Sequence, residues 1–313
     1  MNIISKRTAK ILSVVFSLIS LFALAGPPTY APADADNLRL SFTAIADTHI
    51  DNVFNGTRVP LLAEGLEDMS KAQVKNDALL IAGDLTEGGL QWEYYKLAYA
   101  LQTRCDADNI LPVSGNHDIW GPRLQNGTRL MNYEYNADKY FDFLRNTAGI
   151  DTATIYFSRE IKGYLFVILN SERLEDDTYL SPAQIGWLDS LLASRAGGGK
   201  PVFVSCHHPL ASIGDEADDL YAVMKKYDGR LDIFFLTGHY HTPFGSGSIV
   251  TDGSVTFVAL PCYGKGTASG PGKTGTGYCV EAYDGEVLFR ARDFTGGRWL
   301  PEYDRAVALT AAG

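Results

Sequence analysis

Basic residues are scarce in this sequence, with 27 Lys and Arg against 37 Asp and Glu in 313 residues. The formal net charge is -10. Proteins that bind a nucleic acid duplex neutralise its phosphates with clustered Lys and Arg, and the body of this chain has no basic run of that kind. We therefore expect no binding to duplex nucleic acid.

Long apolar runs are also lacking, since the main one, residues 11–24, has about 14 residues and a bilayer span needs roughly 20. This run follows three basic residues and ends in a small-residue segment at Ala25. The three parts predict a secretory signal peptide at residues 1–25, and hence an exported protein, periplasmic or secreted. A retained N-terminal anchor is the alternative, and we expect no stable membrane span after cleavage.

The rest of the chain shows no internal repeat and no linker between domains. Residues 26–37 are rich in Pro and Ala and are interpreted as a flexible lead-in. A single domain is then expected over residues 38–295, followed by a C-terminal tail at 296–313.

Cysteine is rare, with four residues whose spacing matches no zinc motif: Cys105, Cys206, Cys262 and Cys279. Export permits disulfides, and Cys262 and Cys279 flank a Gly-rich loop between two strand-like runs. A bridge between these two is one hypothesis. Cys206 ends an apolar run and is interpreted as a buried thiol.

Short apolar runs alternate with segments of helical periodicity, which predicts an α/β fold. The predicted strands are residues 38–46, 78–82, 110–113, 164–169, 202–206 and 233–236, and the predicted helices are 61–74, 92–101, 136–148, 182–194 and 220–227. After residue 256 we expect an antiparallel run of strands at 256–260, 278–283 and 287–293.

Histidine is limited to six residues, and every one lies in a cluster directly after a predicted strand. The carboxyl ends of the strands in an α/β sheet gather along one edge, so we expect these clusters to converge. The clusters are Asp47-Thr48-His49, Gly83-Asp84, Gly115-Asn116-His117-Asp118, Cys206-His207-His208-Pro209 and Gly238-His239-Tyr240-His241.

The residue types in these clusters suit metal binding. Residues two apart in an extended backbone project to the same side, so Asp47 with His49, and His239 with His241, can chelate. Asp84 offers two oxygens and can bridge two ions. Mixed oxygen and imidazole ligands suit Mn, Fe, Zn or Co.

Each cluster also has a purely structural interpretation. A single aspartate after a strand is often a helix cap or a turn residue, and a single histidine is more often a hydrogen-bonded structural residue. The joint placement of all six histidines at strand ends argues against that interpretation for the set.

In this order, the motifs D-x-H, GD, GNHD, HHP and GHxH resemble those of the calcineurin-like metallophosphoesterases, from Asp47 to His241. The resemblance implies a four-layer αββα sandwich with two mixed β-sheets and two divalent metal ions. It implies a first metal held by Asp47, His49, Asp84 and His241, and a second held by Asp84, Asn116, His207 and His239. His208 could take the place of His207.

The expected reaction is hydrolysis of a small phosphate ester, in which two metals lower the pKa of a bound water and the resulting hydroxide attacks phosphorus. His117 would contact the phosphoryl oxygens or protonate the leaving group. Asp118 would fix the His117 tautomer, or would only cap the following turn.

Purple acid phosphatases are similar but have a metal-bound tyrosine where this chain has Glu87. The compact layout most resembles the branch of cyclic nucleotide and glycerophosphodiester phosphodiesterases, which predicts a phosphodiesterase. A phosphomonoesterase with the same centre, or a non-catalytic binding protein on the same fold, are the alternatives.

Overall fold

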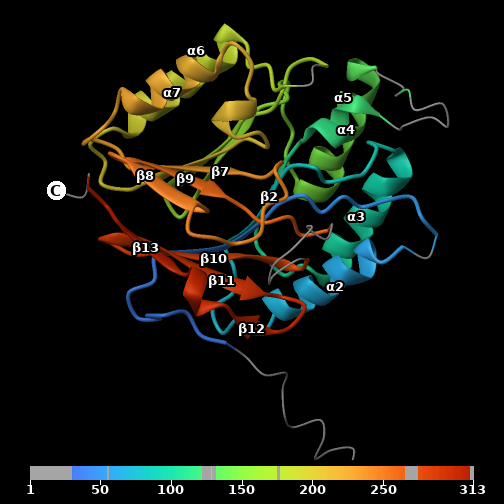
Figure 1. Cartoon of the computed structure of the whole chain (residues 1–313), viewed down its shortest axis with the longest axis horizontal. Helices are drawn as coiled ribbons and strands as arrows, with labels where there is room; N and C mark the ends of the chain where they lie inside the picture. The colour runs from blue at the N-terminus through green and yellow to red at the C-terminus, as the bar shows by residue number, and fades with distance from the viewer. Residues whose placement is uncertain are drawn as a thin grey trace, which may run out of the picture.

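The chain folds into two β-sheets that pack together, with helices on both outer sides (Figure 1). The structure is a computed structural model that describes residues 30–54, 56–121, 128, 132–174, 177–264 and 274–310. The predicted signal peptide at residues 1–25 lies outside the described residues. Two mixed sheets within an α/β fold confirm the predicted fold class.

The first sheet has seven strands, in the order β12-β11-β10-β1-β2-β3, with β13 also paired to β11. Strands β1, β2 and β3 run parallel, and the others pair antiparallel. The bounds are β1 Leu40–Ile45, β2 Ala78–Ala82, β3 Ile110–Val113, β10 Thr276–Ala282, β11 Glu286–Asp293, β12 Arg298–Trp299 and β13 Arg305–Ala308.

The second sheet has six strands, in the order β4-β5-β6-β7-β9-β8. Its four central strands are parallel, and the edge strands β4 and β8 pair antiparallel. The bounds are β4 Phe157–Ile161, β5 Tyr164–Ile168, β6 Val202–Ser205, β7 Ile233–Thr237, β8 Ile249–Asp252 and β9 Val255–Ala259.

Helices cover the outer faces of both sheets (Figure 1). The bounds are α2 Arg58–Met69, α3 Gln91–Arg104, α4 Asn116–Trp120, α5 Tyr133–Phe143, α6 Pro182–Arg195 and α7 Ala217–Lys225, with a π-helical turn Leu144–Ala148 and 3-10 turns Leu210–Ser212 and Pro301–Tyr303. Among the described residues, no helix is long and apolar enough to cross a membrane.

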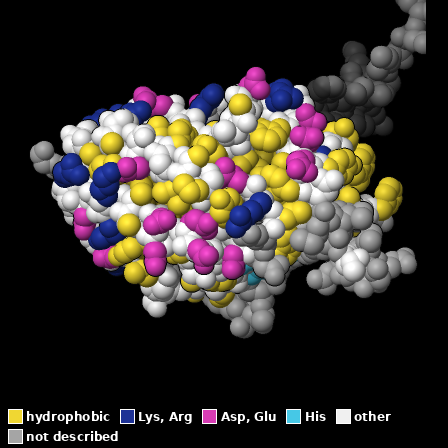
Figure 2. All heavy atoms as spheres, turned by 90° about the horizontal axis from the view of Figure 1, so that it is seen from above, with side chains coloured by type: hydrophobic (Ala, Val, Ile, Leu, Met, Phe, Trp, Pro, Cys, Tyr) yellow, Lys and Arg dark blue, Asp and Glu magenta, His cyan; other side chains and the backbone are white. Residues whose placement is uncertain are grey.

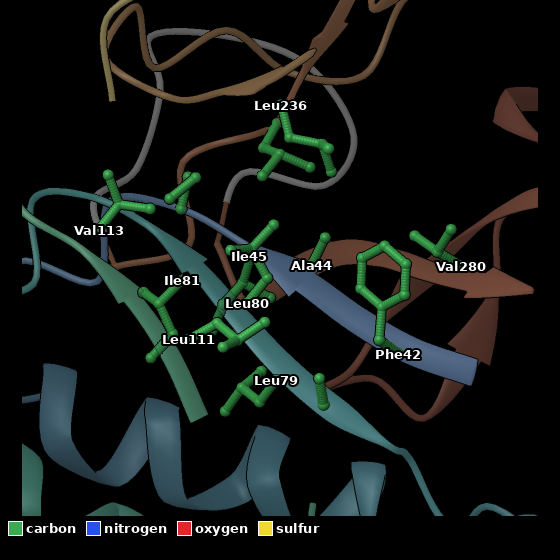
Figure 3. Close-up of a cluster of buried hydrophobic side chains, with 14 of the residues drawn as sticks. Phe42, Ala44, Ile45, Leu79, Leu80, Ile81, Leu111, Val113, Leu236 and Val280 are labelled. Atoms are coloured by element: carbon green, nitrogen blue, oxygen red, sulfur yellow. The ribbon is translucent and has the colours of Figure 1, made fainter. Parts of the chain in front are cut away.

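Two apolar clusters hold these layers together. The larger one lies between the sheets and under α2 and α3, and Figure 3 shows its centre around Phe42, Leu80 and Leu236. The smaller one joins the second sheet to α6 and α7 through Leu188, Val204 and other residues. Because both faces of the central strands are covered, these strands consist mostly of apolar residues.

The prediction that residues 256–260 join the C-terminal antiparallel run is wrong. Strand β9 lies in the second sheet, parallel to β7, with Phe235 opposite Phe257. A short apolar run shows that a segment is a strand but does not identify its partner. Residues 278–282 and 287–293 do pair antiparallel, as β10 and β11.

The segments on either side of the predicted domain also pack on it. Residues 298–299 and 305–308, predicted as a tail, pair with β11. Tyr30, in the predicted lead-in, forms a bridge to Ala72 and packs edge-on against Trp299 with ring centroids 5.1 Å apart. Tyr30 and the strands at residues 298–299 and 305–308 therefore pack on the domain predicted over residues 38–295.

The hypothesis of a disulfide between Cys262 and Cys279 is wrong, since none of the four cysteines forms a disulfide. Cys279 lies within β10, next to Thr43 of β1. Cys262 forms a bridge to Ala46 at the end of β1, and its thiol donates to the carbonyl oxygen of Asp47. The chain crosses to the other sheet between β9 and β10, so these two residues do not close a hairpin.

Candidate metal centre

Five loops meet where the two sheets present the carboxyl ends of their parallel strands. The loops after β1, β2 and β3 come from the first sheet, and those after β6 and β7 come from the second. Each loop carries one of the clusters predicted to bind metal. The seven predicted ligands, Asp47, His49, Asp84, Asn116, His207, His239 and His241, all lie in this region, as the distances below show.

Backbone strain is concentrated in these loops. Six described residues other than glycine have a positive φ, and five of them are predicted ligands: Asp47, His49, Asp84, His239 and His241, with φ between 45° and 75°. Left-handed backbone is costly for such residues and collects at functional sites. The i, i+2 pairs therefore converge through tight left-handed turns, and the extended backbone expected from the sequence is wrong at these positions.

The first group of ligand atoms faces a single point. The Nε2 atoms of His49 and His241 lie 2.9 Å apart. Nε2 of His241 is 3.2 Å from Asp47 Oδ1, and Nε2 of His49 is 3.4 Å from Asp84 Oδ2. Two imidazole nitrogens turned toward each other beside two carboxylates are a donor set that fits a divalent cation.

A second group lies on the other side of Asp84. Nε2 of His207 is 3.3 Å from Asp84 Oδ1, and Nδ1 of His239 is 3.2 Å from Asn116 Oδ1. Asp84 thus turns one carboxylate oxygen toward each group. This is the arrangement predicted for a bridging ligand.

His207 and His208 both lie with His239 in one group of potential ligand atoms, and the Nε2 atom of each is buried without a hydrogen-bond partner among the described residues. Nδ1 of His207 contacts the carbonyl oxygen of Ala82 at 2.9 Å, and since a carbonyl only accepts, Nδ1 carries the proton. Nε2 therefore faces Asp84, and it can bind a metal once its own proton is lost. Nδ1 of His208 contacts Thr178 Oγ1, and burial followed by the nearby His207 and His239 lowers its pKa well below the ordinary value.

The charges in this centre favour a bound cation. Although burial opposes charge on both groups, the Asp84 carboxylate raises the pKa of His207 to about 9. Against the same cost of burial, His207 and His49 hold the pKa of Asp84 well below its ordinary value. Protonated His207 supplies the positive charge that this buried carboxylate needs, and a bound cation would take that place as the histidine loses its proton.

Two glycines allow the loops to approach this closely. A Cβ atom on Gly83, whose φ is +87°, would overlap the His207 ring, and one on Gly115 would overlap Asp84 Oδ1. Glycine is required at such close approaches because any side chain would push the ligands apart.

His117 lies beside the first ligand group and is not itself one of the seven predicted ligands. Its Nδ1 donates to the carbonyl oxygen of Glu87 at 2.8 Å, and its ring meets the His49 ring edge-on, with centroids 4.7 Å apart. Its side chain is 16% exposed. With Nδ1 bound to a carbonyl, Nε2 is the nitrogen that can gain or lose a proton.

The expectation that Asp118 fixes the His117 tautomer is wrong, because the Glu87 carbonyl has that position. The Asp118 carboxylate is fully buried and accepts from the backbone N–H groups of Leu85, Thr86 and Gly115 and from Thr86 Oγ1, at 2.7–3.0 Å. It therefore ties the loop after β2 to the start of α4, where it caps the helix as the alternative predicted.

One contact was not predicted from the sequence. Arg58, at the start of α2, donates to both the His49 carbonyl oxygen and Glu87 Oε2 at 2.6 Å. Arg58 belongs to none of the sequence motifs. It follows His49 by nine residues, and only the fold brings its side chain back to that cluster.

Comparison with known proteins agrees with this geometry. The sequence is 30% identical over 207 residues to a serine/threonine-protein phosphatase, CPPED1, of Pongo abelii, covering 60% of each chain. It is 26% identical over 215 residues to a probable cyclic nucleotide phosphodiesterase of Ruthia magnifica, covering 64% of this chain and 78% of that one. The matched region thus spans less than two thirds of the primate relative.

Among solved structures, the fold is similar to that of a dimetal phosphatase from Danio rerio, with a TM-score of 0.60 at 13% identity, covering 87% of this chain and 99% of that one. The sequence model of the calcineurin-like phosphoesterases matches residues 40–243, which include all seven predicted ligands. The chain belongs to the calcineurin-like phosphoesterase family.

Proposed function

We propose that this protein is a dinuclear metal-dependent phosphodiesterase that acts on a small phosphate diester. The observation that carries the hydrolytic role is the Asp84 carboxylate, which turns one oxygen to each of two histidine-rich ligand groups. When bound, two divalent ions would activate water and stabilise charge on the phosphoryl oxygens. Asp47, His49 and His241 would hold one ion with Asp84, and Asn116, His207 and His239 would hold the other.

The residues of the chain account for the other half of the reaction, departure of the leaving group. His117 is oriented by the Glu87 carbonyl at Nδ1, so in its protonated form Nε2–H can donate to the leaving oxygen. Its backbone N–H donates to Asp84 Oδ1 at 3.0 Å, which fixes its place relative to both ligand groups.

Charge supports a diester over a monoester. A diester has one negative charge, whereas a monoester has up to two, and extra cations usually stabilise the second. Arg58 lies beside His49, but its guanidinium pairs with Glu87 at 2.6 Å and with Asp51 at 3.3 Å. On the face shown in Figure 2, basic side chains are interspersed with acidic ones.

A phosphomonoesterase with the same centre is the second candidate, since the relative from Pongo abelii is named a phosphatase. Rates of hydrolysis of bis(p-nitrophenyl) phosphate and p-nitrophenyl phosphate, measured with added Mn²⁺, separate the two. A strong preference for the monoester would refute the phosphodiesterase proposal. Metal analysis of the purified protein would identify the ions among Mn, Fe, Zn and Co.

A non-catalytic binding protein is the remaining alternative. The presence of His117 beside all seven ligands argues against it, because binding alone does not need a proton donor. If Asp84→Asn and His117→Ala leave a measured phosphoesterase activity unchanged, the proposed centre is wrong.

We further propose that the protein is exported, on the basis of the charged, apolar and small-residue parts of residues 1–25. Expression of the full chain with its N-terminus intact, followed by mass analysis of the extracytoplasmic fraction, tests this. The expected product begins near Gly26, and full-length protein retained in the cytoplasm would refute export.

A further inference from the structure

We propose that Glu87 is a positioning residue for the metal ligand His49, and that Arg58 holds Glu87 in this role. The inference rests on the proposed metal-dependent function. Glu87 occupies the sequence position at which purple acid phosphatases, as noted above, have a metal-bound tyrosine. The structure gives it a different partner.

The two ring nitrogens of His49 face opposite ways. Nε2 points to the first ligand group, 2.9 Å from His241 Nε2 and 3.4 Å from Asp84 Oδ2. Nδ1 is buried without a hydrogen-bond partner among the described residues, and Glu87 Oε2 lies 3.3 Å from it. The carboxylate is therefore on the side of the ring away from the ligand group, where it can accept from Nδ1–H.

Arg58 fixes the Glu87 carboxylate in that place. Its Nη1 lies 2.6 Å from Glu87 Oε2 and also donates to the His49 carbonyl oxygen at 2.6 Å. Its Nε lies 3.3 Å from Asp51 Oδ2. One guanidinium thus joins the backbone of His49 to the carboxylate that faces the His49 ring, and this forms a closed set of contacts around the ring.

A third metal site at this point is excluded by the same contacts. His49, Glu87 and His117 do bring potential ligand atoms together. However, the positive charge of Arg58 already lies against Glu87 Oε2, and Nδ1 of His117 is engaged by the Glu87 carbonyl. A second cation would be repelled by the guanidinium, which leaves the carboxylate available to the N–H at His49 Nδ1.

The consequence is control of how strongly His49 binds. A carboxylate that accepts from the outer N–H of a metal-binding histidine sets its tautomer and raises its basicity, and its loss costs about 10- to 100-fold in metal affinity. Glu87 also sets the tautomer of His117 through its backbone carbonyl. One residue therefore orients a metal ligand with its side chain and the proposed proton donor with its main chain.

Calorimetric titration of the metal-free full chain with Mn²⁺ tests this proposal. For Glu87→Ala we expect about 10- to 100-fold weaker binding at one of two sites, with the other site little changed. Glu87→Gln keeps an acceptor oxygen without the charge, so it should lose less. The matched control is Glu160→Ala, which removes an exposed glutamate of β4 that pairs with Arg195 of α6. This variant should bind Mn²⁺ like the unaltered protein.

Thermal unfolding in EDTA shows whether each variant folds. If Glu87→Ala does not fold, the Mn²⁺ titration of Glu87→Gln tests the proposal instead. Binding of both ions within about twofold of the unaltered protein, or equal weakening of both sites, would overturn the proposal. Unaltered protein that binds two Mn²⁺ but cleaves no phosphoester would refute the proposed function and leave the role of Glu87 standing. Failure to bind any of Mn²⁺, Fe²⁺, Zn²⁺ and Co²⁺ would refute both.

Discussion

The backbone N–H of His117 donates a hydrogen bond to Asp84 Oδ1 at 3.0 Å, so the proposed proton donor is attached to the carboxylate that the two ligand groups share. This bond does not involve the imidazole ring. A change of the His117 side chain should therefore alter proton transfer without displacing Asp84, which makes the two functions separable by mutation.

His117→Asn should lower kcat by about 10²- to 10⁴-fold for a diester with an alkyl leaving group, because such a group needs a proton as it departs. The loss should be much smaller for bis(p-nitrophenyl) phosphate, whose leaving group is stable as an anion. Steady-state rates on both substrates check this, and Mn²⁺ content should stay unchanged. An equal loss on both substrates would show that His117 does not act as the acid.

Asp84→Asn should remove the response to metal and should also lower the stability of the metal-free protein. The amide oxygen can still accept from the His117 N–H, but the charge pair with His207, which holds the pKa of Asp84 low, is lost. The melting temperature in EDTA should therefore fall, and the increase on adding Mn²⁺ should disappear. A large Mn²⁺-induced increase in the variant would show that Asp84 does not bridge the two groups.

The location of the centre could be predicted from the sequence because it depends on chain order and on one rule of α/β folds. The clusters at Asp47, Asp84 and His207 each follow a buried parallel strand, and the carboxyl ends of such strands meet at one edge. The approximate positions of strands and helices could also be predicted, because short apolar runs and helical periodicity are local patterns.

What could not be predicted depends on contacts between residues distant in sequence. The partner of β9, the role of Asp118 and the return of Arg58 to His49 are set by tertiary packing, which leaves no periodic pattern. Local propensity also gives no indication that five ligands adopt left-handed backbone, since the surrounding fold imposes that strain.

The main expected effect of Asp118→Asn is a lower free energy of unfolding, with a smaller direct effect on the catalytic reaction. The carboxylate accepts four hydrogen bonds from buried donors on two loops, and an amide in its place would turn N–H groups toward some of them. We expect a loss of about 2–3 kcal/mol in the free energy of unfolding, measured by urea denaturation. Asp142→Asn, at an exposed position beside Arg145, is the control and should change stability little.

Gly115→Ala should abolish metal binding although no ligand is changed, because the added methyl group would overlap Asp84 Oδ1. Gly186→Ala is the matched control, since it lies within α6 and a Cβ there meets no atom within 4 Å. That variant should bind Mn²⁺ normally and be more stable by roughly 0.5–1 kcal/mol. Normal Mn²⁺ binding by Gly115→Ala would contradict the close approach of the two loops.

The four thiols should be unreactive in the folded protein and all reactive once it unfolds. Burial raises the pKa of Cys206 and Cys279 to about 12 and that of Cys105 to about 11, so few thiolates exist near neutral pH. A disulfide reagent at pH 8 should react slowly with native protein and should detect four thiols in guanidinium without reductant. Two thiols under those conditions would restore the bridge between Cys262 and Cys279.

The raised pKa values of these thiols also determine how the free energy of unfolding changes with pH. Cys105, Cys206 and Cys279 lose their protons at a lower pH in the unfolded chain than in the native protein, so the native state binds more protons above about pH 9. Their contribution to stability is complete below that pH and is lost as the pH rises toward the native values. Urea denaturation at pH 8 and pH 10 should therefore show lower stability at pH 10. Cys206→Ser, which removes one of the buried thiols, should reduce that difference.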